Sequence, residues 1–169
     1  IYPHNLGEGK LQGAQENDFN YYKGCILQAM GQNNEAQIFF QKACAGNNQP
    51  VAAMYYNDQK PDKVFYQGLA LLKLGNEGKA CSCFNRLIDF GEKHLFDIFK
   101  MDYFAVSLPD LQIWEDDMNR KNRVHCNYLM GLGHLGLGHV EKAKTYFGIA
   151  SELDNNHQGV QIHSEMINE

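Results

Sequence analysis

The residues most suggestive of chemistry in this 169-residue chain include a glycine pattern near its C-terminal end. Gly131, Gly133 and Gly136 match the G-x-G-x-x-G fingerprint of dinucleotide-binding sites. That fingerprint binds phosphate where it follows a strand and opens a helix, because the phosphate contacts the free amides of the helix start. Here the glycines fall inside an expected helix, so they do not indicate a nucleotide site.

Four neighbouring side chains could in principle bind a metal ion: His125, Cys126, His134 and His139. Metal ligands must converge on one point, whereas Cys126 and His134 are about two helical turns apart. We expect core or surface histidines here and no metal site. Tight retention of zinc, lost on mutating Cys126 and His134, would support the metal-binding alternative.

Two further groups could carry redox or acid–base chemistry. Cys81 and Cys83 lack the C-x-x-C spacing of redox pairs, and two residues apart on a helix their thiols diverge. An acidic cluster precedes a basic one: Glu115, Asp116 and Asp117, then Arg120, Lys121 and Arg123. Opposite charges one helical turn apart are typical of exposed ion pairs. With no nucleophile beside a base and an orienting group, we expect no catalytic residues, no cofactor and no enzyme activity.

Composition narrows the classes of partner. The net charge of −5 and the pI near 5.8 argue against binding to nucleic acid, which needs a clustered basic face. The sequence contains no run of about 18 apolar residues, so we expect no membrane insertion. The chain has five cysteines, which is an odd number and too few for a disulfide-rich scaffold. We therefore expect free thiols and a cytoplasmic location. The start IYPHNLGEGK lacks an initiator Met, and we expect a piece of a longer polypeptide.

A pattern of small and aromatic residues recurs three times along the chain. In each copy a glycine is followed at +7, +12, +16 and +19 by a second glycine, an alanine, a phenylalanine and a small or aliphatic residue. The copies are Gly24, Gly31, Ala36, Phe40 and Ala43; Gly68, Gly75, Ala80, Phe84 and Leu87; and Gly131, Gly138, Ala143, Phe147 and Ala150. The second glycine interrupts a helical spacing of apolar residues, so each copy predicts a helix–turn–helix unit.

The first glycine of each copy indicates close packing of helices. Gly24, Gly68 and Gly131 lie inside expected helices, where glycine costs about 1 kcal/mol relative to alanine. Three such glycines at one register imply that a facing helix approaches too closely for a side chain. We expect the phenylalanine of each copy to fill the space between hairpins.

The repeat positions set the expected organisation of the chain. We expect a lead-in over 1–16, hairpins over 17–46, 61–91 and 124–154, insertions over 47–60 and 92–123, and a capping helix over 156–169. Within the insertions we expect one helical turn after residue 50 and a short helix from Asp110 through Trp114. A terminal helix with a polar outer face would cap the stack.

The repeat resembles the tetratricopeptide repeat (TPR) family, whose 34-residue helix–turn–helix unit has small, aromatic and alanine residues at these intervals. The resemblance implies an all-α, helical-hairpin solenoid. It covers roughly 100 residues in the three copies and is specific for fold rather than function.

A narrower resemblance extends over nearly the whole chain. The segments YPHNLGEGKL, YYNDQKPD, DYFAVSLPDL and HCNYLMGLGHLGLG are similar to the C-terminal part of large bacterial proteins. In those proteins a β-rich domain of the galactose-mutarotase-like kind precedes a TPR segment. This resemblance implies a parent protein involved in carbohydrate handling and assigns no catalytic residue to this chain.

The first helices of the three copies share an aromatic and aliphatic track that could bind a peptide or a partner helix. Its residues stand three before, one after and four after each first glycine: Tyr21, Cys25 and Gln28; Phe65, Leu69 and Leu72; and Tyr128, Leu132 and Leu135. The alternative is that these residues pack against a neighbouring hairpin or against 92–123.

Three hypotheses for function follow. The first is a non-catalytic protein–protein interaction module that binds a partner or peptide along this track. The second is an intramolecular brace that packs on an upstream β-rich domain of the same polypeptide. A metal-binding module or an enzyme is a distant third.

Overall fold

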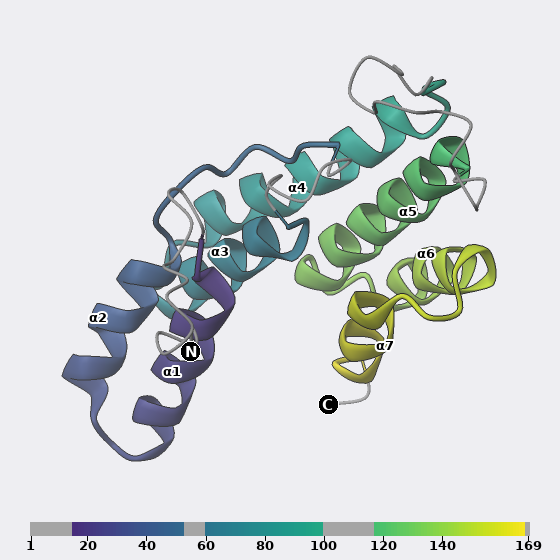
Figure 1. The fold of residues 1–169 in the computed structure, drawn as a ribbon. Helices are drawn as coiled ribbons and strands as arrows, with labels where there is room; N and C mark the ends of the chain where they lie inside the picture. The colour runs from purple at the N-terminus through teal and green to yellow at the C-terminus, as the bar shows by residue number, and fades with distance from the viewer. Residues whose placement is uncertain (1–14, 53–59, 100–116, 168–169) are drawn as a thin grey trace, which may run out of the picture.

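A computed structural model of the chain describes residues 15–52, 60–99 and 117–167 (Figure 1). Within these ranges the ordered elements are all helices, which confirms the predicted all-α fold of helical hairpins. Their bounds are α1 Asn17–Ala29, α2 Asn33–Ala43, α3 Asp62–Lys73, α4 Glu77–His94, α5 Met118–Gly136, α6 Val140–Leu153 and α7 Gln158–Glu165.

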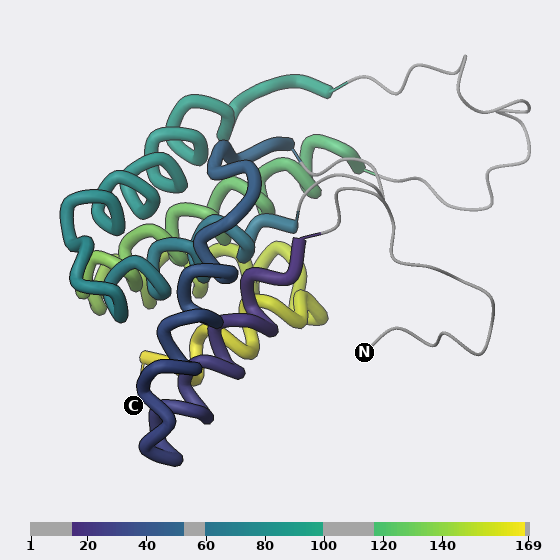
Figure 2. Tube along the Cα trace, turned by 90° about the vertical axis from the view of Figure 1, so that its left-hand side faces the viewer, coloured from purple at the N-terminus to yellow at the C-terminus, as the bar shows by residue number. Residues whose placement is uncertain are grey.

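The first six helices form three antiparallel hairpins, α1–α2, α3–α4 and α5–α6. The two helices of each pair run side by side (Figures 1 and 2). The turns between them contain Gly31, Gly75 and Gly138, with φ values of 79°, 74° and 74°. Residues with a Cβ rarely adopt this left-handed conformation, so glycine ends the first helix of each hairpin as predicted.

Close packing inside each hairpin depends on the first glycine of the repeat. A Cβ added to Gly24 would lie 2.6 Å from the Phe40 ring, and one added to Gly131 would lie 2.4 Å from the Phe147 ring. These separations are well below van der Waals contact. The phenylalanine of the second helix therefore packs directly on the backbone of the first, within the hairpin rather than only between hairpins.

The buried side chains form two clusters. The larger one joins the second and third hairpins and α7, and contains Phe65, Phe84, Leu129 and Phe147. The smaller one lies in the first hairpin and includes Ala36, Phe40 and Ala43, with Ala70 of α3. The recurring alanines and phenylalanines of the repeat therefore belong to the core.

The third hairpin starts earlier than its expected boundary at 124. Helix α5 begins at Met118, and the Asp117 carboxylate accepts a hydrogen bond from the Arg120 backbone N–H at 2.9 Å. Asp117 is thus a helix N-cap, which explains one member of the acidic cluster without acid–base chemistry. Glu115, Asp116 and the helix expected at 110–114 lie outside the described residues, as do most of the lead-in and of the turn expected after residue 50.

The C-terminal helix α7 lies against α5 and α6 of the third hairpin, at the position expected of a cap. It also reaches further, because His163 contacts the rings of Phe65 and Tyr66 in α3. None of the helices in the described part of the chain is long and apolar enough to cross a membrane.

Candidate partner-binding groove

A groove of about 1700 Å³ runs along the first helices of the hairpins. Residues of α1, α3, α5 and α7 line it. In Figure 1, α1 and α7 lie on opposite sides, with α3 and α5 between them. The first helices therefore form the concave face of the molecule, and α7 forms its second wall.

The α1 wall presents a stripe of exposed apolar side chains. Phe19, Tyr22 and Ile26 are 60 %, 44 % and 61 % exposed and line the groove. Their spacing of three and four residues places them on one face of the helix. Ile162 of α7, 44 % exposed, lines the same groove from the other wall. Contiguous exposed apolar side chains of this kind mark interaction sites more often than isolated ones do.

Polar contacts hold the α1 wall to α3. The Lys63 ammonium pairs with the Asp18 carboxylate at 2.5 Å, and the hydroxyls of Tyr22 and Tyr66 lie 3.0 Å apart. Asp62 lies beside this pair, and burial raises the pKa of its carboxyl group. Both contacts join residues of different hairpins, so they help to set the position of the wall over the groove.

The track predicted from the sequence differs from the exposed surface of this groove. Phe65, Tyr128 and Leu132 are 0 %, 2 % and 0 % exposed, so they offer a partner no open surface in this structure, and their contact with a partner stays a prediction. Phe65 packs on Phe84, with ring centroids 6.0 Å apart, and Tyr128 packs on Phe147. Both rings therefore pack on the second helix of their own hairpin.

The other six track residues have mixed surroundings. Gln28 and Leu72 are exposed, and four are half-buried: Tyr21, Cys25, Leu69 and Leu135. Of all nine, only Tyr128 contributes to the lining of the groove. Contact of these six residues with a partner stays a prediction.

Sequence reasoning missed Tyr22 and Tyr66, which follow Tyr21 and Phe65 directly. One residue along a helix is a rotation of 100°, which carries a side chain from the hairpin interior to the groove. A usable signal was the hydroxyl group, because a tyrosine keeps one end near water or a polar partner. The matching position in the third repeat is Leu129, which does not line the groove.

The glycine fingerprint has a packing role in α5. A Cβ on Gly133 would lie 2.6 Å from Ile88, and one on Gly136 would lie 2.3 Å from Phe84. These glycines lie inside a helix, where the backbone amides are already bonded. They let α5 approach α4 closely.

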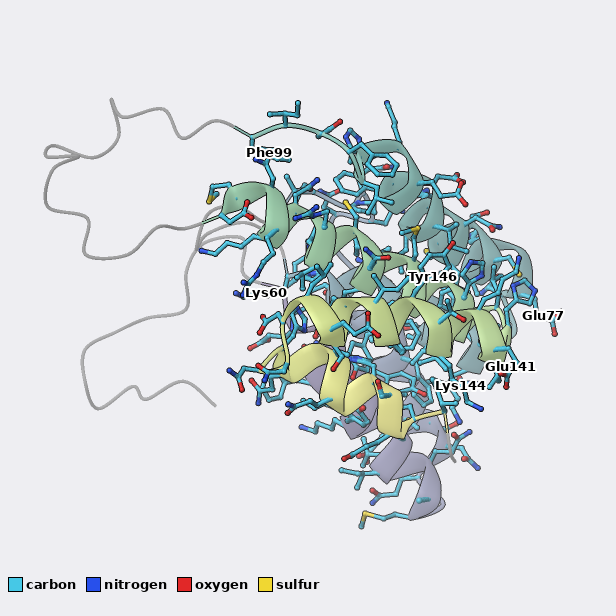
Figure 3. All side chains as sticks on the ribbon, turned by 90° about the vertical axis from the view of Figure 1, so that its right-hand side faces the viewer. Lys60, Glu77, Phe99, Glu141, Lys144 and Tyr146 are labelled. Atoms are coloured by element: carbon cyan, nitrogen blue, oxygen red, sulfur yellow. The ribbon has the colours of Figure 1, made fainter. Side chains whose placement is uncertain are left out.

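The candidate metal ligands form two separate sets. The Nδ1 atoms of His134 and His139 lie 3.3 Å apart, and His134 stacks on Tyr146, which is labelled in Figure 3. The His125 Nε2 atom is instead 2.8 Å from the Val51 carbonyl oxygen. Within the described ranges, no three or more His, Cys, Asp or Glu side chains come together in a way that could hold a metal ion.

The cysteines are all free thiols. Cys81 is exposed and Cys83 is buried, so the two thiols have different surroundings, as their spacing on one helix predicts.

Patterns of the tetratricopeptide repeat family match residues 18–45 and residues 64–89. These segments coincide with the first hairpin and with most of the second. The chain is a tetratricopeptide repeat protein. The third hairpin of this TPR protein has the same glycine–phenylalanine contact as the first two, although the family patterns match only the first two.

No solved structure matches the chain. TPR repeats generally mediate protein–protein interactions and are typically non-catalytic.

Proposed function

We propose that this TPR protein is a non-catalytic interaction module that binds a segment of a partner protein in the groove between α1 and α7. The observation that carries the proposal is the exposed stripe of Phe19, Tyr22 and Ile26 on a groove wall. At about 1700 Å³ the groove exceeds the roughly 300–1,000 Å³ of small-molecule pockets. Its size and apolar wall suit a polypeptide segment.

Charges around the groove suggest the composition of that segment. Lys23, Lys60 and Arg120 line the groove together with Asp62 and Asp154, so both signs are present. Lys60, labelled in Figure 3, precedes α3. The Lys23 ammonium lies 4.2 Å from the centroid of the Phe39 ring, which also lines the groove. A segment with an apolar centre and polar flanks of both signs would complement this surface.

A peptide library displayed on phage and selected on the whole chain tests the proposal. Enriched peptides should bind the wild type and lose at least tenfold in affinity for Phe19→Asp/Ile26→Asp, because each change puts a carboxylate against the apolar centre of the ligand. Ile38→Asp is the matched control, since Ile38 is 50 % exposed and lies outside the groove lining. Circular dichroism checks that all variants are folded.

Equal binding by the wild type and the double variant would contradict the groove as the binding site. The intramolecular brace differs from an adaptor in its natural ligand, which would be a domain of the same polypeptide rather than another protein. A β-rich domain of the same polypeptide that competes with the selected peptides would favour the brace over an adaptor.

A further inference from the structure

One residue of α7 covers the aromatic side chains that the first helices direct toward the concave face. The ring centroid of His163 lies 5.5 Å from that of Phe65 and 5.7 Å from those of Tyr66 and Tyr128. His163 itself is 2 % exposed. Two residues of the predicted track, Phe65 and Tyr128, therefore contact α7 at a position where a partner could bind.

The position of α7 depends on a close approach at Gly159. A Cβ on Gly159 would lie 2.5 Å from the Tyr128 hydroxyl oxygen and 2.7 Å from Cζ. Any larger residue would push the helix away from α5 or displace the tyrosine ring. The contact between α7 and the groove is thus specific and easily disrupted.

His163 makes an incomplete set of polar contacts in this position. Its Nδ1 atom lies 2.7 Å from the Gly159 carbonyl oxygen and 3.0 Å from the Tyr128 hydroxyl oxygen. Its Nε2 atom is buried and has no hydrogen-bond partner in the described part of the chain. A buried polar atom without a partner opposes docking, whereas an apolar side chain of similar size would fill the same space without that cost.

Helix α7 is also too short to persist alone. It spans eight residues, Gln158–Glu165. Isolated helices shorter than about 12 residues are marginal in water. α7 should therefore be helical only while it is docked, which gives it two states, docked and released.

From this geometry we propose that α7 is a displaceable wall of the groove, which competes with a partner segment for the rings of Phe65, Tyr66 and Tyr128. Its effect on partner binding rests on the function proposed above, whereas its release can be measured without a partner. Release uncovers two residues of the track predicted from the sequence, Phe65 and Tyr128.

Protonation of His163 should release α7. The titratable groups around its ring are Asp62 and Tyr66 of α3, Asp18 of α1, Tyr128 of α5 and His157 of α7. Burial is the largest influence and lowers the pKa of His163, although the carboxylates of Asp62 and Asp18 act in the opposite direction. The released imidazole titrates near pH 6.5. Above that value docking is insensitive to pH, and below it the released state binds the proton first, so docking weakens.

Hydrogen–deuterium exchange of residues 158–165 in the whole chain tests the release. After correction for intrinsic exchange rates, wild-type protection should fall by up to about tenfold from pH 7.5 to pH 5.5. His163→Leu should reduce this fall to the part contributed by His157, whose pKa burial also lowers and whose Nδ1 accepts from the Val160 N–H. Gly159→Ala should abolish most protection at both pH values. Gly148→Ala is the control, because a Cβ on Gly148 meets no atom within 4 Å.

Wild-type protection retained in Gly159→Ala, or the same fall in His163→Leu as in the wild type, would overturn the proposal. The competition is tested with a peptide selected on the wild type, which should bind Gly159→Ala several-fold more tightly. If α7 is released in that variant and affinity does not rise, the competition is refuted. The groove proposal is judged separately, by the Phe19→Asp/Ile26→Asp variant.

Discussion

The ring of Phe84 occupies the space that a side chain at position 68 would need. A Cβ on Gly68 would lie 2.3 Å from Cε1 of Phe84, and a Cβ on Gly136 would lie 2.3 Å from Cδ1 of the same ring. Gly68 belongs to α3 and Gly136 to α5, so one ring packs on the backbones of two hairpins. This contact explains one of the α5 glycines that resemble a nucleotide fingerprint, Gly136.

Gly68→Ala should destabilise the protein. The added methyl group meets the Phe84 ring, and such overpacking typically costs about 1–3 kcal/mol. Urea unfolding followed by circular dichroism measures the change in free energy. Gly148→Ala in α6 should be neutral or stabilising by up to about 1 kcal/mol, because its Cβ points into open space. Equal effects of the two substitutions would show that close approach is not the reason for Gly68.

Phe147→Ala should lower the free energy of unfolding by about 3–5 kcal/mol, the usual cost of deleting a buried phenylalanine side chain. Phe147 is 2 % exposed and packs on Gly131 and Tyr128. Phe19→Ala should change stability by less than about 0.5 kcal/mol, because Phe19 is 60 % exposed. Thermal and urea unfolding provide the comparison. A large loss in Phe19→Ala would mean that the exposed stripe contributes to the core.

Asn17→Ala should loosen the C-terminal end of α2. The Asn17 side-chain amide donates to the carbonyl oxygens of Ala43 and Ala45, at 2.7 Å and 2.8 Å. Losing both bonds leaves buried acceptors and should cost about 1–3 kcal/mol. Asn17→Asp should cost more, because a carboxylate would face these carbonyl oxygens. If instead Asp is tolerated as well as Asn in urea unfolding, the bonds do not support the hairpin.

The cysteines should differ widely in reactivity toward iodoacetamide at pH 8. Burial raises the pKa of the Cys126 thiol to about 12 and that of Cys44 to about 11, so little reactive thiolate is present. Cys81 is exposed and should be modified first. Peptide mass spectrometry follows each site, with urea-unfolded protein as the control for full labelling. Early labelling of Cys126 in the folded protein would contradict its burial.

The same two thiols should make the protein less stable in alkaline solution. An unfolded cysteine loses its proton near pH 8.5, whereas buried Cys126 and Cys44 keep theirs to higher pH. Above pH 8.5 the folded state therefore binds more protons than the unfolded state, and the free energy of unfolding falls as the pH rises. Cys126→Ala should reduce this slope between pH 8.5 and 10 in urea unfolding. An unchanged slope would assign the effect to other groups.

The all-α hairpin fold was predictable from local rules. Glycine at positions 31, 75 and 138 ends a helix because only glycine readily adopts positive φ, and a 3.6-residue spacing of apolar residues predicts a helix between such stops. The mid-helix glycines also predicted a close approach, since no local advantage explains them. These features depend on neighbours within about one helical turn or one hairpin.

The candidate site needed the tertiary structure. The sequence favoured Phe65 over Tyr66 as a groove residue, although the two differ by one helical step. Both rings are buried, and only the packing of Phe65 against Phe84 leaves Tyr66 as the one that lines the groove. The capping helix could be predicted from the residues of its own segment. The contact of His163 with Phe65 of α3 could not, because it joins residues about a hundred positions apart.

By itself, the sequence determined the repeat, the turns and the helices, because backbone conformation and helical periodicity are properties of short segments. Only the tertiary structure decided which face of α1 and α3 meets the groove and that α7 lies beside it. Those choices depend on the rotation of each helix about its axis and on contacts between hairpins, which the burial of the whole core determines.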